Sequence, residues 1–110
     1  MFVLKADHEF DWPVTVRIPI DGGKYASQTF TARFRLPSKD EMTNMAAVLG
    51  DDAANARKVM VGWDGIVDEQ KQPVPFSDEA LDALLGVPWA RVAIWQAFID
   101  ASFGIKRKNS

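Results

Sequence analysis

The residues of this chain that are able to perform chemistry are few, and the most suggestive group surrounds its only histidine. His8 stands between Asp7 and Glu9, with Asp11 close behind, and imidazole with carboxylates is a combination that zinc sites use. Zinc needs three or four ligands that converge from separate elements, and side chains at neighbouring positions of one segment do not converge. We therefore expect His8 to be exposed to solvent and to bind no metal.

Other patterns that are typical of catalytic or ligand-binding sites have simpler structural interpretations. The Gly22-Gly23 pair lacks the spacing of a phosphate-binding loop, and the acidic residues within 64–69 lack the spacing of a calcium-binding loop. No Gly-x-Ser-x-Gly elbow is present. Triads are recognised by geometry, so sequence order leaves one through His8 open, but each plausible serine already has a capping role. The sequence thus predicts no catalytic residue and no cofactor, and we expect that the protein is not an enzyme.

Composition narrows the class of protein further. The 110 residues carry a net charge of −2, with 47% hydrophobic and 25% charged residues, which are ordinary values for one globular domain. No basic field favours nucleic acid, and no apolar run approaches the ~20 residues of a membrane span. The first residues meet the charged residues Asp7 and Glu9 almost at once, so they are not expected to form a signal peptide. The absence of cysteine fits a reducing cytosol, so we expect a cytoplasmic protein that binds neither nucleic acid nor membrane.

Residues 14–36 show the pattern of two strands joined by a tight turn at Asp21-Gly22-Gly23-Lys24. Apolar residues alternate with polar ones on both sides of this turn. The apolar sets are Val14, Val16, Ile18 and Ile20 on the first strand, and Phe30, Ala32, Phe34 and Leu36 on the return strand. Pro19 has no N–H to donate, so the first strand should lie at an edge of the sheet or end there. Met1–Leu4 is expected to add a short strand.

Two helices are expected after this ribbon. Ser38 and Glu41 form a capping-box pattern that opens the first helix, and Gly50 is its expected end. Its apolar positions are Met42, Met45, Ala46 and Leu49. A second helix should run from Ala53 to about Val61, capped by Asp51 or Asp52, burying Ala56, Val59 and Met60. The segment 62–65 should break it, and a short extended pair, Ile66 and Val67, should lead into an acidic turn at 68–71.

Two further helices complete the expected order of elements. Ser77 should cap a helix that ends at Gly86, with Leu81, Leu84 and Leu85 buried. Pro88 suits the first turn of a last helix that ends at Gly104. The buried face of that last helix is expected to hold Val92, Trp95, Phe98, Ile99 and Ser102, widened by Trp89, Ile94 and Ala101.

The sequence therefore predicts an α+β fold, in which an N-terminal antiparallel β-hairpin or small sheet is followed by three to four helices. One domain should span residues 1–104, with the β-ribbon at about 1–36 and the helical segment at about 38–104. Residues 105–110 are expected to form a mobile basic tail.

The aromatic residues suggest an interaction surface. Aromatic residues make up 11% of the chain, more than a core of this size hides easily, because tryptophan is seldom buried completely. Exposed aromatic side chains on a rigid helix are typical anchors of interfaces. We expect at least one of Trp63, Trp89, Trp95 and Phe98 to lie in a partner-binding or self-association surface.

The second half of the chain resembles the tail assembly chaperones of long-tailed bacteriophages and prophages. The resemblance lies in Lys58-Val-Met-Val-Gly-Trp63-Asp-Gly-Ile-Val67, in the helix entry Pro75-Phe76-Ser77, and in Leu84-Leu-Gly-Val-Pro88. It continues through the closing aromatic helix with Gly104 to Lys108-Asn109, and covers roughly Ser38 to Asn109. The ribbon before it is consistent with the family without being diagnostic.

This resemblance implies a non-catalytic protein of the host cytoplasm that is absent from the mature virion. Members of the family bind the tape-measure protein, a long, largely helical and aggregation-prone chain, before tail-tube subunits polymerise around it. The resemblance also implies self-association into oligomers, with the tail-tube protein as an additional candidate partner. A structural virion protein, such as a head–tail connector or tail-completion subunit, is the alternative, because it too oligomerises and lacks catalysis.

Overall fold

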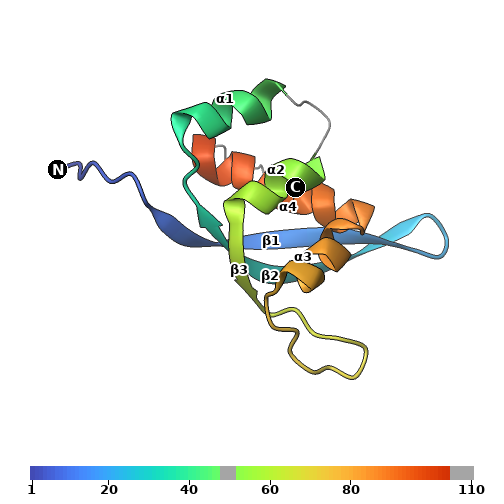
Figure 1. Ribbon diagram of the computed structural model, residues 1–110. Coiled ribbons are helices and arrows are strands. Elements are labelled where there is room, and N and C mark those ends of the chain that lie inside the picture. Colours follow the sequence, from blue (N-terminus) through green and yellow to red (C-terminus); the bar gives the residue numbers. More distant parts are fainter. Residues whose placement is uncertain (48–51, 105–110) are drawn as a thin grey trace.

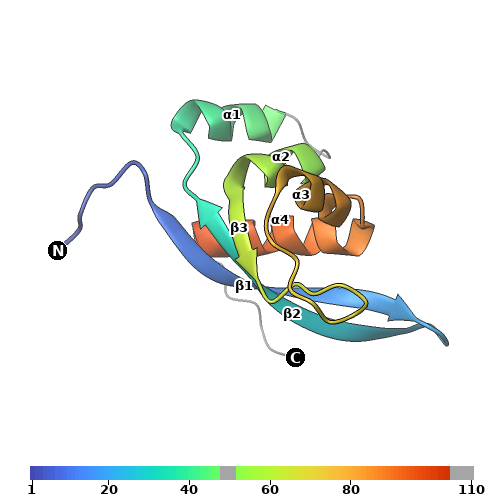
Figure 2. The same cartoon turned by 60° about the horizontal axis from the view of Figure 1, so that its bottom comes forward.

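The computed structural model describes residues 1–47 and 52–104 and has an α+β fold (Figure 1). A three-stranded antiparallel sheet in the order β1-β2-β3 combines with four helices, which confirms the predicted α+β class, although the strand β3 was not expected. The elements in chain order are β1 (Glu9–Ile20), β2 (Lys24–Arg35), α1 (Lys39–Ala47), α2 (Asp52–Val59), β3 (Met60–Asp64), α3 (Asp78–Leu85) and α4 (Pro88–Phe103). The helices gather on one side of the long β1–β2 hairpin, whose tip projects beyond them (Figure 2).

The β1–β2 hairpin has the predicted alternation. Its pairing runs from Glu9 opposite Arg35 to Ile20 opposite Lys24, and Gly22 and Gly23 take the positive φ values of 82° and 72° that the turn requires. The inward positions closest to the helices are buried: Val14, Val16, Phe30, Ala32 and Phe34. Ile20 and Leu36 were also expected inside, but they are 50% and 46% exposed, since Ile20 is the last residue of β1 and Leu36 follows the last residue of β2.

Two prolines lie on the free edge of β1. The N–H of Leu36 donates to the His8 carbonyl at 2.8 Å, so these two residues form a hydrogen-bonded pair. The even-numbered residues of β1 therefore direct their backbone groups toward β2. Every second residue of an antiparallel strand points its backbone groups away from its neighbour. Counting from His8 in the observed register, Pro13 and Pro19 occupy such outward positions. The prediction that Pro19 marks an edge strand is confirmed, because β1 has only one neighbour.

The strand β3 corrects the expected end of the second helix. The helix α2 ends at Val59, and Met60–Asp64 forms a strand instead of a helical turn and a break. Asp64 pairs with Thr31 and Met60 with Phe34, with a bulge beside Arg33. The edge of β2 would otherwise lack a partner there, so pairing over long range overrides the local helical pattern. The expected strand at Met1–Leu4 is wrong as well, because these residues pair with nothing in the described chain and are exposed.

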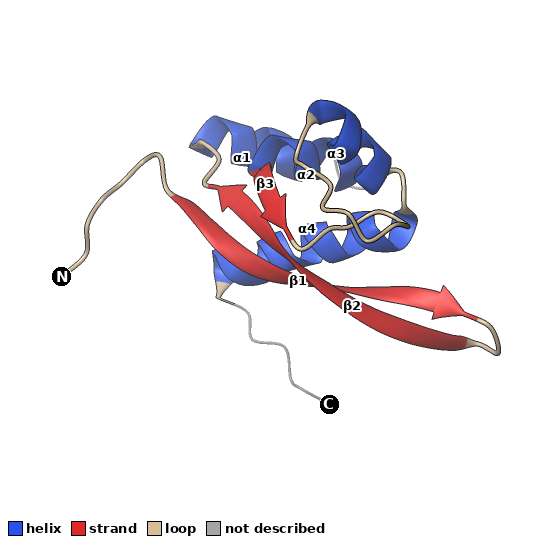
Figure 3. Ribbon diagram, turned by 90° about the horizontal axis from the view of Figure 1, so that it is seen from below, coloured by secondary structure: helices blue, strands red, loops and turns tan. Residues whose placement is uncertain are grey.

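The helix α4 packs along β1 with a buried face that matches the expected one only in part. Ile94 and Phe98 are buried as expected, whereas Trp89 is 41% exposed. The buried side chains of α4 are Ala90, Ile94, Ala97, Phe98 and Asp100. Val92 and Ser102 were expected inside, but both are exposed. Trp95 and Ile99 are only half-buried. Apolar residues occur on all sides of α4, so its periodicity did not select one face. The face is selected instead by packing against β1, along which α4 runs (Figure 3), and against α2.

Local caps set the other helix boundaries. The Glu41 N–H donates to Ser38 Oγ, and the Ser38 N–H donates to Glu41 Oε1, both at 3.1 Å, which confirms the capping box. Ser77 Oγ accepts from the N–H of Ala80 at 3.1 Å and caps α3, whose Leu81 and Leu85 are buried as expected. Leu84 is half-buried. The expected stop at Gly50 and the basic tail at 105–110 lie outside the described residues.

Candidate functional site

The residues that the sequence offered as possible metal-binding groups do not lie together in a site: His8 is on the surface, and Asp68 lies in a turn. His8 is exposed and stacks on Phe10, with ring centroids 5.8 Å apart. Oδ1 of Asp68 accepts the N–H groups of Gln70 and Gln72, each at 2.9 Å, and so closes a turn. In the described ranges, 1–47 and 52–104, no three His, Cys, Asp or Glu side chains are grouped to hold a metal ion.

Trp63, the first of the four aromatic candidates, fastens a loop to the sheet. It is half-buried on β3, and its Nε1–H donates to the carbonyl of Val74 at 2.7 Å. Its ring meets that of Phe76 edge to face, with centroids 4.9 Å apart. A buried indole usually finds such a hydrogen-bond partner. Trp63 thus holds the segment between β3 and α3 in place.

Trp95 lies at the boundary of the core, and Phe98 lies in its interior. Phe98 is 1% exposed, and its ring meets the ring of Phe34 edge to face at 5.5 Å. Trp95 is half-buried and stacks on Phe98 with centroids 5.5 Å apart and planes at 21°. Phe98 therefore offers no surface to a partner in this arrangement, and removal of Trp95 would disturb the core beneath it.

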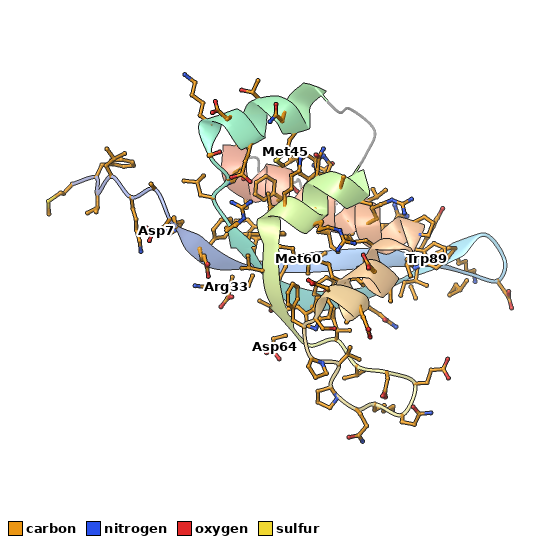
Figure 4. All side chains as sticks on the ribbon, in the orientation of Figure 1. Asp7, Arg33, Met45, Met60, Asp64 and Trp89 are labelled. Carbon is orange, nitrogen blue, oxygen red and sulfur yellow. The ribbon has the colours of Figure 1, made fainter. Side chains whose placement is uncertain are left out.

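Trp89 is the aromatic candidate that faces solvent. Its side chain is 41% exposed, and it lies one residue after Pro88, at the end of α4 nearest the hairpin tip (Figure 4). Nη1 of Arg91 donates to the carbonyl of Leu85 at 2.8 Å, which ties the start of α4 to the end of α3. Trp89 therefore projects from a braced helix end instead of a loose loop.

Two neighbouring hollows meet at Trp89. The first, of about 240 Å³, lies between the hairpin and the α3–α4 turn and is lined mainly by apolar side chains. The second, of about 520 Å³, lies between the outer side of β1 and α4. Trp89 lines both of them, so the two hollows share this side chain.

The second hollow brings together residues that sequence reasoning did not associate. We call it the Trp89 surface, and it includes Pro19, Tyr25, Pro88, Trp89 and Val92. Tyr25 and Val92 are 57% and 56% exposed. Tyr25 belonged to neither apolar set of the predicted ribbon, and helical spacing placed Val92 inside. Only the position of α4 beside β1 makes them neighbours of Trp89.

Polar groups border this apolar surface. The guanidinium of Arg17 lies over the Tyr25 ring, 4.3 Å from its centroid. Arg17, Thr15 and Gln96 line the same hollow. An apolar centre with a polar border is the usual anatomy of a protein-binding surface.

The described helices do not suggest a membrane span, because none of them is both long enough and apolar enough to cross a bilayer. The chain was also compared with known proteins. No family model, curated protein or solved structure matches it.

Proposed function

We propose that this protein is a phage tail assembly chaperone, which binds the tape-measure protein and keeps it soluble until the tail tube assembles. The role is non-catalytic and belongs to the cytoplasm of the bacterial host. The resemblance of residues 38–109 to this family supports the proposal. The observation that carries it is the Trp89 surface, where a tryptophan, a tyrosine and a valine are exposed together on a braced scaffold.

The mechanism is capture of apolar stripes on partner helices. A helix that seeks a groove presents apolar residues at positions i, i+3, i+4 and i+7. The Trp89 surface lies between a strand and a helix and offers a hollow of about 520 Å³ for such side chains. Trp89 and Tyr25 supply large, rigid contact areas, and Arg17 supplies a positive charge at the border for carboxylates of the partner.

The test is co-expression of the chain with the tape-measure protein encoded in the same genome, followed by pull-down. We expect the tape-measure protein to be soluble and to co-purify with the wild-type chain. The variant Trp89→Ala should lose most of this association while it keeps its fold. The matched control is Phe103→Ala, because Phe103 is also exposed on α4 but lies about 21 Å away along the helix axis.

Two outcomes would redirect the interpretation. Equal binding by Trp89→Ala and wild type would place the contact elsewhere on the molecule. An insoluble tape-measure protein without any association would favour the structural virion protein, such as a head–tail connector or tail-completion subunit. Purified particles distinguish these classes, because a chaperone is absent from them and a virion component is retained.

A further inference from the structure

The outer edge of β2 is only partly covered. The strand β3 pairs with residues from Thr31 to Phe34. Tyr25, Ser27 and Thr29 point their backbone groups away from β1, because they alternate with residues that bond to it. Among the described residues, no backbone hydrogen bond joins these three positions to a segment beyond β2's outer edge. This part of β2 is therefore an open edge, which is a template for a further strand.

The other edge of the sheet is protected in a way that this one is not. Pro13 and Pro19 stand at outward positions of β1 and cannot donate hydrogen bonds there. Proline is a common means of blocking an edge against strand addition. From Tyr25 to Thr29 the outer edge of β2 contains no proline, so strand addition is directed to this side.

An apolar hollow lies beside the open edge. It is the hollow of about 240 Å³ near the α3–α4 turn, and its lining includes Gln28, Thr29 and Phe30 of β2. Its other walls are apolar side chains of β1, of the segment after β3 and of the α3–α4 region, among them Ile18, Ile66, Leu84 and Val87. Alternate side chains of a strand added to the edge would point toward these walls.

The chain itself contains an exposed apolar segment that suits this apolar hollow. Met1, Phe2, Val3 and Leu4 are exposed by 119%, 86%, 74% and 90%, and they belong to no strand or helix. We call them the arm. The arm leaves the body at the end opposite the hairpin tip in all three ribbon views (Figures 1–3). A run of exposed apolar residues indicates a contact with another surface.

The arm cannot pair along its whole length with the open edge of its own molecule. Glu9 pairs with Arg35, and Thr29 lies six residues further along β2, about 20 Å away at ~3.3 Å per residue. Leu4 would have to lie beside Thr29 or beyond it for all four arm residues to pair there, but the five steps from Glu9 back to Leu4 span at most about 18 Å when fully extended. They would also have to pass around β3, which occupies the edge between the two points.

We propose that the arm Met1–Leu4 of one copy adds as a strand to the Tyr25–Thr29 edge of a second copy and inserts apolar side chains into the hollow beside it. Strand addition of this kind combines main-chain hydrogen bonds with side-chain pockets. The arm and the open edge lie toward opposite ends of the ribbon, so the contact is head-to-tail and each added copy leaves one arm and one edge free. The inference does not depend on the identity of any other partner.

The first test measures self-association of the full chain without a partner. Mass is followed by light scattering or sedimentation over a range of concentrations. We expect the wild-type mass to rise in multiples of 12.3 kDa. The arm variant Phe2→Ser with Leu4→Ser, and the edge variant Ser27→Pro, should each remain at the monomer mass. The matched controls Lys5→Ser and Ser27→Thr should behave as wild type.

Mixing the two defective variants gives the sharpest outcome. The arm variant keeps an open edge and the edge variant keeps an arm, so the mixture should form dimers and nothing larger. A wild-type chain that stays monomeric at every concentration would overturn the proposal. Self-association of the arm variant at the wild-type level would overturn it as well, and this variant changes no residue of the folded body.

The contact itself is testable because the chain has no native cysteine. Copies with Leu4→Cys, mixed with copies that carry Ser27→Cys, should yield a disulfide-linked heterodimer on mild oxidation. Copies with Asp40→Cys on α1 replace the edge variant in the control, and the yield should fall at least tenfold. Equal yields in both mixtures would show that the arm does not dock at this edge.

Discussion

The guanidinium of Arg17 on β1 lies 4.3 Å from the ring centroid of Tyr25 on β2. The two residues are diagonal neighbours on the outer face of the hairpin, since Arg17 is opposite Ser27 and Tyr25 is opposite Pro19. The cation holds the aromatic ring beside Trp89, so this pair shapes the border of the Trp89 surface.

Replacement of Arg17 should affect binding more than folding. An exposed cation–π pair contributes about 0.5–1 kcal/mol, so Arg17→Gln should change the free energy of unfolding by no more than about 1 kcal/mol. Tape-measure binding should weaken about fivefold, which corresponds to a similar free energy. Titration of both variants measures this, with Arg33→Gln on the same face as the control. Equal affinities for Arg17→Gln and wild type would exclude a role for this pair.

Trp63→Phe should loosen the loop between β3 and α3. The substitution keeps an aromatic ring against Phe76 but removes the indole N–H that donates to Val74 at 2.7 Å. The free energy of unfolding should fall by about 1 kcal/mol. Hydrogen exchange should become faster at the amide of Val74, which bonds to the Ile66 carbonyl. Trp89→Phe serves as the control and should leave that amide protected.

Phe98→Ala should be among the most destabilising single changes. Phe98 is 1% exposed and packs against Phe34 and Trp95, so its removal leaves a cavity in the core. The expected loss is about 3–5 kcal/mol in the free energy of unfolding, measured by denaturant titration. Phe103→Ala on the same helix should change it by no more than about 0.5 kcal/mol, because Phe103 is 60% exposed. Similar losses for both would contradict the assignment of the core.

The link between β2 and α1 should weaken at low pH. The Arg35 guanidinium donates to both carboxylate oxygens of Glu41, at 3.2 and 2.5 Å. Chiefly through these bonds, and secondly through the Ser38 N–H, the pKa of Glu41 is lowered from 4.5 to about 2. A lowered pKa in the folded state stabilises the fold above the unfolded-state pKa, and this contribution is lost as the pH falls through the folded-state value.

Glu41→Gln should therefore flatten the decline of thermal stability between about pH 4.5 and pH 2. Melting curves of both proteins across this range measure the difference, with Asp40→Asn as the control. A decline as steep in Glu41→Gln as in wild type would assign the acid sensitivity to other carboxylates.

Removal of the edge prolines should increase association without loss of the fold. Pro13→Thr with Pro19→Thr restores two outward N–H groups on β1, and the outward positions contribute no hydrogen bond to β2. The free energy of unfolding should change by about 1 kcal/mol or less per site. Sedimentation should show larger species than for wild type at equal concentration. Unchanged association would show that the two prolines do not protect this edge.

The sequence predicted those elements whose causes lie within a few residues. The alternation around Gly22-Gly23 determined the hairpin, because period and turn chemistry are local properties. The capping box of Ser38 with Glu41 and the cap at Ser77 were likewise predicted. These features were sufficient for the α+β class and for an edge position at Pro19.

Only the tertiary structure decided which long-range surfaces meet. The strand β3 forms because its backbone groups pair with those of β2 at Thr31–Phe34. This pairing partner is distant in the sequence, so the pattern within residues 60–64 does not predict the strand. The buried face of α4 was undetermined because apolar residues occur on all sides of the helix, and only its packing against β1, α2 and α3 selected it. That choice separated exposed Trp89 from buried Phe98 and assembled the Trp89 surface from the β1–β2 hairpin and the distant helix α4.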